Sequence, residues 1–360
     1  MDSSESDEFV RAHNRLFPRA GSGHAEAMRA YFDPRQLAHA PALELHNGAF
    51  VPCAETPARA EAVLAALGPV EPAVDHGEAP LRAVHDEAYL AFLWSAHNDW
   101  RAAGREGDAA GYAWPVVRRR PLALDRIDAK LGAYSFDASS PIAAGTWEGA
   151  YWSAQTALTA LDAVLGGERA AFALCRPPGH HAGRDYLGGY CHLNNAAIAA
   201  EAATRAGRRV AILDVDYHHG NGTQDIYYAR GDVLFVSIHA DPKLDYPYYW
   251  GHADETGECD GEGATLNLPL PRGTALAAYL PTLETALARI AAFRADLLVI
   301  SYGADTFAGD PISHFRLETA DYAVMAGRIA ALHLPSLVVM EGGYAVDALG
   351  ANTAAFLSGF

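Results

Sequence analysis

Hydrophobic and polar positions follow their clearest pattern in the second half of the chain. From residue 144 onward, continuous apolar runs alternate with longer segments in which one face is apolar and the other polar. Continuous apolar runs are typical of strands buried on both faces, and the longer segments are typical of amphipathic helices. Their alternation predicts an α/β fold with a mainly parallel central sheet and helices on both faces.

The predicted strands of this half are AAFALCR (170–176), RVAILDV (209–215), DVLFVSIH (232–239), DLLVISY (296–302) and SLVVMEG (336–342). The predicted helices cover 145–167, 194–207, 274–293 and 318–332. Helical connections between parallel strands place ligand sites at the carboxyl ends of the strands.

The first half is less regular. Helices are predicted at 57–68, which has Pro near its start and Gly at its end, and at 86–96. Residues 1–25 are interpreted as a loosely held N-terminal segment of a single domain that spans 1–360. Residues 97–143 have weak periodicity and many helix breakers, and so long a connection is usually a functional insertion such as a lid or an interface. Its arginines, Arg118 to Arg120, are interpreted as a solvated face or a subunit contact.

Charge and composition narrow the class of protein. The 27 Lys and Arg against 44 Asp and Glu give a net charge of −17, which disfavours a nucleic-acid partner. The sequence has no long uninterrupted apolar stretch and starts with the acidic MDSSESDE, so we expect a cytoplasmic protein without a membrane association. The 4 cysteines are widely spaced and are expected to be buried free thiols.

Unusual polar residues follow the predicted strands. RPPGHHAG, DYHHGNGTQ, GADTFAGDP and EGGYA each come directly after an apolar run. Together they bring these side chains to one rim of the sheet: His180, His181, Asp214, Asp216, His218, His219, Asp305 and Tyr344.

Three of these side chains form a candidate metal site. Asp216 and His218 are separated by one residue, so on an extended strand exit both point to the same side. With Asp305 they give three protein ligands without a thiolate, as in catalytic zinc sites that keep one open position. The alternative is a polar turn at the end of a strand.

The tandem His180 and His181 suits proton transfer, because imidazole titrates near neutral pH and can be tuned by a partner on its other nitrogen. Asp214 and Asn221 are the candidate partners, one anionic and one neutral. The alternatives are that the two histidines bind metal or are ordinary loop residues.

Tyrosines supply the remaining candidates. Tyr344 follows Gly342 and Gly343, where it can donate a hydrogen bond to an oxyanion, or else it is a packing residue. Gly189, Tyr190 and Tyr246 are candidate substrate contacts. Aromatic clusters of this kind, which here continue to Tyr248, Tyr249 and Trp250, also occur in cores and interfaces.

The motifs RPPGHHAG, LDVDYHHGNGTQDIYY, GADTFAGDP and EGGY together resemble the zinc-dependent deacetylase superfamily of arginase-like fold. This superfamily includes histone deacetylases, bacterial histone-deacetylase-like amidohydrolases and acetylpolyamine amidohydrolases, and the chain is most similar to the last group. The resemblance implies that Asp216, His218 and Asp305 bind Zn²⁺, although such a ligand set also accepts Fe²⁺ or Co²⁺. It also implies that His180 and His181 serve as general acid and base.

The same resemblance implies a role for Tyr344 in polarising the scissile carbonyl. It further implies a structural K⁺ surrounded by Asp214, His218 and Ser237 with the backbone carbonyls of Asp216 and Ile238. Position 221 is Asn where some classical deacetylases have Asp. We therefore expect His181 to be the base of lower pKa, while His180, held by Asp214, stays protonated longer.

The implied reaction is hydrolysis of an N-acetylated primary amine, most closely an acetylpolyamine, to acetate and the free amine. The insertion 97–143 resembles an element that narrows the entrance to the active site and builds a homodimer. The net charge of −17 suits a small cationic substrate. None of the acidic residues of the insertion, Glu106, Asp108, Asp125 and Asp128, can be singled out. The alternatives are action on acetyl-lysine peptides or another amide, and a non-catalytic protein that binds acylated amines.

Overall fold

The computed structural model describes residues 28–115 and 123–360, so the segment 1–25 and Arg118 to Arg120 lie outside the described residues. Its main feature is a seven-stranded sheet in which every neighbouring pair is parallel. The order of the strands is β1 (Arg29–Tyr31), β4 (Ala170–Ala173), β9 (Ser336–Met340), β8 (Leu297–Tyr302), β5 (Val210–Asp214), β6 (Val233–Ala240) and β7 (Thr265–Leu270). The expected parallel α/β sheet is confirmed.

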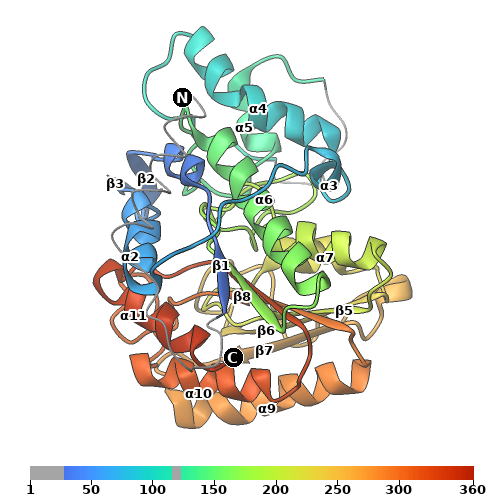
Figure 1. Ribbon diagram of the computed structural model, residues 1–360. Helices are drawn as coiled ribbons and strands as arrows, with labels where there is room; N and C mark the ends of the chain where they lie inside the picture. Colours follow the sequence, from blue (N-terminus) through green and yellow to red (C-terminus); the bar gives the residue numbers. More distant parts are fainter. Residues whose placement is uncertain (1–27, 116–122) are drawn as a thin grey trace.

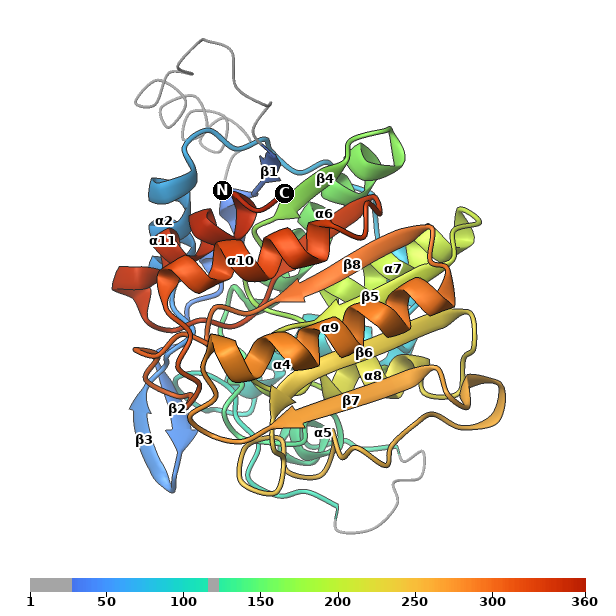
Figure 2. The ribbon, with the colours of Figure 1, turned by 90° about the horizontal axis from the view of Figure 1, so that it is seen from below.

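Helices cover both faces of the sheet, as Figures 1 and 2 show from two directions. One face packs against α6 (Thr146–Leu165) and α7 (Asn195–Arg205), with α3 (Ala79–Arg82), α4 (Glu87–Ala102), α5 (Ile127–Ala133) and α8 (Asn221–Tyr227) on the same side. The other face packs against α9 (Leu276–Phe293), and its helical layer continues through α10 (Thr319–Ala330), α11 (Val346–Leu357) and α2 (Pro57–Leu67).

Strand β5 shows why the central strands are continuous apolar runs. Val210 and Ile212 belong to the core on the α6 and α7 side, whereas Ala211 and Leu213 belong to the core on the α9 side. Successive side chains of a strand point to opposite faces, so both sets of positions in β5 are apolar because both face a core. The first polar side chain, Asp214, comes at the carboxyl end.

The helices and strands predicted after residue 144 are all present, with ends that differ by a few residues. Helix α4 continues to Ala102, and α5 lies within the segment 97–143 that was expected to be irregular. Pattern analysis missed the edge strands β1 and β7. β1 has only 3 residues, and β7 contains Pro269, which a sheet edge tolerates.

The other elements that pattern analysis missed are short or lie near the chain ends: the hairpin of β2 (Leu43–His46) and β3 (Ala49–Pro52), the 3₁₀ helices Pro34–Ala38 and Cys259–Gly261, and α3, α8 and α11.

The expectation of buried thiols is correct for Cys53, Cys175 and Cys191 and wrong for Cys259, which is exposed. Cys259 begins a surface 3₁₀ turn, outside the apolar strands and helices that bury the others. Among the helices of the described residues, none combines the length and apolarity that crossing a membrane requires.

Candidate active site

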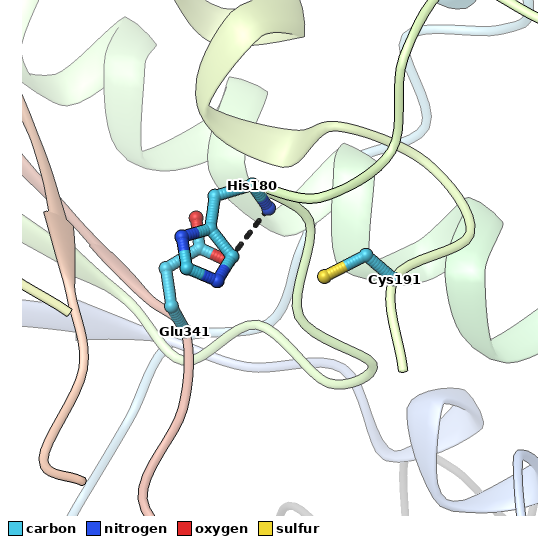
Figure 3. Close-up of side chains that lie close together, drawn as sticks. All are labelled: His180, Cys191 and Glu341. Carbon is cyan, nitrogen blue, oxygen red and sulfur yellow. Dashed lines mark hydrogen bonds between the residues drawn. The ribbon is translucent and has the colours of Figure 1, made fainter. Parts of the chain in front are cut away.

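The loop that carries the two histidines leaves the carboxyl end of β4 and is held by Glu341 from the end of β9. One carboxylate oxygen of Glu341 accepts hydrogen bonds from the backbone N–H groups of Gly179 at 2.6 Å and His180 at 3.1 Å. The other accepts from Ser301 Oγ at 3.1 Å. Figure 3 shows the Glu341 carboxylate behind the His180 ring, with the bond to the His180 backbone dashed. A buried carboxylate thus fixes the start of the loop.

The rings of the two histidines lie 4.1 Å apart with their planes tilted by 48°, and they have different partners. Nδ1 of His180 lies 3.1 Å from Asp214 Oδ2, and Nδ1 of His181 lies 2.7 Å from Asn221 Oδ1. Burial opposes the charged form of both rings. For His180 the carboxylates of Asp216 and Asp214 outweigh burial and raise its pKa to about 10. For His181 burial and the neighbouring His180 and His218 lower the pKa well below its usual value.

Asp216, His218 and Asp305 come together from the ends of β5 and β8, and their ligand atoms all lie within 4.8 Å of one another. His218 Nδ1 lies 2.9 Å from Asp305 Oδ2. Backbone N–H groups hold the carboxylates: Tyr217 donates to Asp305 Oδ1 at 3.0 Å, and Gly342 donates to Asp216 Oδ2 at 2.8 Å.

The two buried carboxylates repel one another. Burial and the charge of Asp216 raise the pKa of Asp305 to about 7, although His218 opposes this. The histidines His180 and His218 overcome burial and keep the pKa of Asp216 low. Two carboxylates and one imidazole in so small a buried space form a donor set that suits a divalent cation.

Gly342 has to be a glycine because it contacts both carboxylates. A Cβ atom at this position would lie 2.6 Å from Asp305 Oδ2 and 2.7 Å from Asp216 Oδ2. The next residue, Gly343, has a φ of +122°, a conformation that L side chains rarely adopt. Gly342 and Gly343 therefore bring the chain close to the candidate metal ligands Asp216 and Asp305 and turn it toward Tyr344.

Tyr344 is nine-tenths buried, and its ring packs 5.3 Å from the ring of Tyr190. Its backbone N–H donates to Asp310 Oδ2 at 2.7 Å. The guanidinium of Arg59 lies 4.7 Å from the ring centroid. Burial raises the pKa of the phenol well above its usual value, so the hydroxyl keeps its proton and is available as a hydrogen-bond donor.

Two of the three candidate substrate contacts, Gly189 and Tyr246, lie against His181, and the third, Tyr190, lies against Tyr344. Gly189 contacts the His181 ring, because a Cβ there would lie 2.2 Å from His181 Cδ2. The Tyr246 ring meets the His181 ring edge-on at 5.1 Å. Asp137 links Gly189 to Tyr246, because it accepts hydrogen bonds from the Gly189 N–H at 2.8 Å and from the Tyr246 hydroxyl at 2.7 Å. The Tyr190 hydroxyl donates to Glu44 at 2.9 Å.

Four other residues that the sequence singled out, His219, Tyr248, Tyr249 and Ser237, have different surroundings. His219 Nε2 is 3.1 Å from Asn267 Oδ1 of β7, and the His219 ring meets the ring of His239 edge-on at 4.6 Å. Tyr248 and Tyr249 are 51% and 81% exposed. Ser237 of the predicted cation site lies directly opposite Asp214 in the pairing of β5 with β6.

Two of the acidic residues of the 97–143 segment are engaged by neighbours. Asp128 is paired with Arg105 and Arg126. Asp108 accepts from the backbone N–H of Ala42 at 2.8 Å.

A second group of ligand-type side chains is formed by His180, Cys191 and Glu341 (Figure 3). The Glu341 carboxylate is already occupied by backbone donors. The thiol of Cys191 lies 3.3 Å from the carbonyl oxygen of Gly189, and burial raises its pKa well above its usual value. This group is therefore explained as the packing behind His180, without a metal.

Sequence reasoning missed several charged residues behind the site. Arg59 donates to the carbonyl oxygens of Gly343 and Glu341, and Glu55 binds both Arg59 and Arg176. Arg176 stands directly before the PPGHH motif, but the other two lie in a segment that reads as an ordinary helix start. Their only sequence signal is a charged residue within an apolar helical pattern.

Comparison with known proteins agrees with the family that the sequence motifs resemble. The histone deacetylase domain matches residues 54–360. The acetylpolyamine amidohydrolase 2 of Pseudomonas aeruginosa is 51% identical over 336 residues, which cover 92% of this chain and 97% of that protein. The acetylpolyamine amidohydrolase of Mycoplana ramosa is 47% identical over 339 residues, with 92% and 99% covered.

A crystal structure of the acetylpolyamine aminohydrolase from Burkholderia pseudomallei superimposes with a TM-score of 0.89 at 44% identity, covering 93% of this chain and 98% of that one. The fold is thus the arginase-like deacetylase fold that the motifs imply. The chain belongs to the histone deacetylase family, and its resemblance to the acetylpolyamine amidohydrolase branch is confirmed over nearly the whole chain.

Proposed function

We propose that the protein is a zinc-dependent amidohydrolase that converts N-acetylated primary amines, acetylpolyamines above all, to acetate and the free amine. The observation that carries this proposal is one buried site in which two adjacent histidines with different partners lie beside the Asp216, His218 and Asp305 group. Amide hydrolysis needs a base, an acid and a means of stabilising an oxyanion, and this arrangement offers a residue for each.

Asp216, His218 and Asp305 would hold the metal. Three oxygen and nitrogen ligands without a thiolate match a catalytic zinc site, and Fe²⁺ or Co²⁺ are the alternatives. When bound, the metal supplies Lewis acidity at the acyl carbonyl and makes water more acidic. The backbone donors of Tyr217 and Gly342 keep the two carboxylates in place.

The histidines divide the proton transfers. His181, whose pKa is lowered, has Nδ1 bonded to Asn221, so its Nε2 is free to accept the proton of the attacking water. His180, whose pKa is raised, holds a proton against Asp214 and Asp216 and can donate it to the departing amine. Different partners thus give two adjacent imidazoles opposite tasks.

Tyr344 donates a hydrogen bond to the carbonyl oxygen as negative charge develops there. Its phenol stays protonated because burial raises its pKa, and the chain around it is fixed by Asp310 and Arg59. Tyr344 is therefore an oxyanion donor held in place before the substrate arrives.

A slender, cationic substrate suits the surroundings. The net charge is −17, and the aromatic rings of Tyr190 and Tyr246 lie beside Tyr344 and His181. Apolar rings can pack along an aliphatic chain while the acidic protein attracts its ammonium groups. The relatives reported above carry the names of acetylpolyamine amidohydrolases, which supports the same substrate class.

The experiment is to measure kcat/KM of the zinc-loaded protein on an N-acetylated polyamine and on an acetyl-lysine peptide with a fluorogenic leaving group. The proposal predicts a strong preference for the polyamine. A preference for the peptide would move the substrate class to acetyl-lysine, and inactivity on both would direct the search to other amides. Retention of bound acetylated amine without turnover would indicate a binding protein.

Three further features belong to the proposal. A K⁺ ion between Asp214 and Ser237, with the backbone carbonyls of Asp216, His218 and Ile238, would have the oxygen ligands that this ion prefers. The other two are a cytoplasmic location and a homodimer built partly by residues 97–143, which the exposed Tyr112 in that segment supports. Light scattering of the purified protein tests the homodimer, and activity with K⁺ exchanged for a bulkier cation tests the ion.

A further inference from the structure

His181 has an amide and not a carboxylate behind its ring. Its Nδ1 lies 2.7 Å from Asn221 Oδ1, and since an amide oxygen only accepts, Nδ1 carries the proton. A carboxylate at this place would also supply a negative charge that stabilises the protonated ring. Asn221 itself carries no such charge.

The hydrogen-bond chain continues beyond Asn221 and ends on a carboxylate. The amide nitrogen of Asn221 donates to the hydroxyl of Tyr186 at 3.4 Å, and that hydroxyl donates to Asp225 Oδ2 at 2.5 Å. Every bond from His181 to Asp225 therefore runs in the same donor-to-acceptor direction. Hydrogen bonds arranged in this way polarise one another, so the charge of Asp225 acts on the imidazole through two neutral groups.

The fold places these groups together. Asn221 and Asp225 are four residues apart in α8, so both side chains lie on one face of that helix. Tyr186 reaches them from the loop that follows His181. Gly183 makes this possible, because a Cβ at that position would lie 2.3 Å from Tyr186 Cε1.

The ring of Tyr186 is fixed by other aromatic rings. Phe136 meets it edge-on at 5.5 Å, and Trp250 stacks on it at 6.5 Å. A side chain held this firmly loses little entropy when its hydroxyl forms both hydrogen bonds.

Asp225 carries its charge at neutral pH. Desolvation is the main cause that raises the pKa of this carboxyl to about 6, and the neighbouring carboxylates Glu255 and Asp185 add to it. Hydrogen bonds from Tyr186 and Trp250 act in the opposite direction. The end of the chain is thus anionic in the neutral and alkaline range.

We propose that Tyr186 and Asp225 are positioning residues for the hydrolysis: through Asn221 they fix the ring of His181 and supply the negative charge that the amide lacks. The inference rests on the proposed function, in which His181 accepts a proton from water. Neither residue touches the reacting atoms.

The kinetic test compares Tyr186→Phe with wild type as zinc-loaded proteins acting on an N-acetylated polyamine. Removing the hydroxyl is expected to lower kcat about tenfold, the usual size for an outer partner of a site residue, with KM and zinc content within about twofold. In an Asn221→Asp background, where His181 has its own carboxylate, Tyr186→Phe should change kcat less than about twofold. The double variant Tyr186→Phe, Asp225→Asn should lose no more of the wild-type kcat than either single variant does.

Tyr227→Phe is the matched control. Tyr227 belongs to the same helix, and its buried hydroxyl donates to the carbonyl oxygen of Ala197 at 2.9 Å, away from His181. Its kcat should stay near that of wild type. An unchanged kcat in Tyr186→Phe, an equal loss in the Asn221→Asp background, or an equal loss in Tyr227→Phe would each overturn the proposal.

A second measurement does not depend on turnover. In zinc-loaded protein labelled with ¹⁵N-histidine, the Nδ1–H proton of His181 can be identified by its absence in His181→Gln. The proposal expects this resonance to move upfield in Tyr186→Phe and to stay in place in Tyr227→Phe, and an unmoved resonance in both would contradict it. If the wild type hydrolyses no acetylated amine, the proposed function fails, whereas the resonance still decides whether Tyr186 acts on His181.

Discussion

The guanidinium of Arg59 donates a hydrogen bond of 2.7 Å to the carbonyl oxygen of Gly343, a residue 284 positions further along the chain. It also donates to the carbonyl oxygen of Glu341 at 2.6 Å, so Arg59 binds the chain on both sides of Gly342. Its charge is balanced by Glu55 at 2.8 Å, and the whole group is buried. A helix near the start of the chain thus fixes the segment that carries Tyr344.

We expect Arg59→Met to lower the free energy of unfolding by about 3 kcal/mol, because it leaves a buried carboxylate with one fewer partner. Turnover should fall about ten- to a hundredfold as Tyr344 loses its fixed position. Urea denaturation and kcat measure the two effects. Arg205→Met is the control: that arginine side chain is 65% exposed and its partner Glu201 keeps Arg230, so the loss should be about 0.5 kcal/mol at most. Equal stability losses in both variants would contradict the role of Arg59.

Tyr344→Phe should lower kcat by about two to three orders of magnitude, because the ring remains but the oxyanion loses its donor. Zinc content by elemental analysis should not change. In the control Tyr279→Phe, a buried ring loses a hydroxyl that has no hydrogen-bond partner among the described residues, and turnover should stay near wild type. Turnover of the Tyr344 variant at the wild-type rate would remove it from the mechanism.

The parallel sheet and the position of the site could be predicted because apolar runs are long where strands are buried on both faces. The motifs after β4, β5, β8 and β9 then have to meet at one edge. The ring partners of His180 and His181 could be expected from the residues after β5, because Asp214 ends that strand and Asn221 follows at the start of α8.

The supporting residues could not be predicted in this way. Arg59, Glu55 and Tyr186 act through contacts between distant segments, and each stands in a sequence pattern typical of a helix or a loop. The edge strand β7 lacks a continuous apolar run, because its leucines alternate with Thr265, Asn267 and Pro269, and a proline argues against a strand. Pattern analysis therefore finds the groups that carry the chemistry and misses those that hold them.

Asp305→Ala should lose the bound metal, because two protein ligands remain of three. Elemental analysis after dialysis measures the zinc content directly. Asp232→Asn provides the control, since that carboxylate is paired with Arg230 at the surface. Full zinc occupancy in Asp305→Ala would take this residue off the ligand set.

Gly342→Ala should destabilise the protein by about 1 to 3 kcal/mol, the usual cost of inserting atoms where no space exists. Its Cβ would press on the carboxylates of Asp216 and Asp305, so zinc affinity should fall as well. Gly327→Ala in α10 has nothing within 4 Å of the added atom and should be neutral or slightly stabilising. Thermal unfolding and zinc titration compare the stability and zinc affinity of the two variants. If Gly342→Ala behaves like Gly327→Ala, the site has room for the added methyl group.

His85 gives a prediction for the effect of pH on stability. Its ring is buried and neutral: Nδ1 donates to the carbonyl oxygen of Gly183 at 2.8 Å, and Nε2 accepts from the backbone N–H of Asn194 at 3.0 Å. Protonation of Nε2 would replace that acceptor with a second donor facing an N–H group. Burial lowers the pKa of His85 to about 4, and the bond to Gly183 opposes this only in part.

In the unfolded chain a histidine has a pKa of about 6.5, so between pH 6.5 and 4 the unfolded state binds more protons than the folded state. The contribution of the neutral His85 to the free energy of unfolding is therefore complete above pH 6.5. It is lost as the pH falls toward 4, by about 1.4 kcal/mol per pH unit. Urea unfolding of metal-free wild type and His85→Gln at pH 7.5 and 5 measures it. The advantage of wild type should shrink by about 2 kcal/mol at the lower pH, and an advantage that stays constant would show that His85 titrates alike in both states.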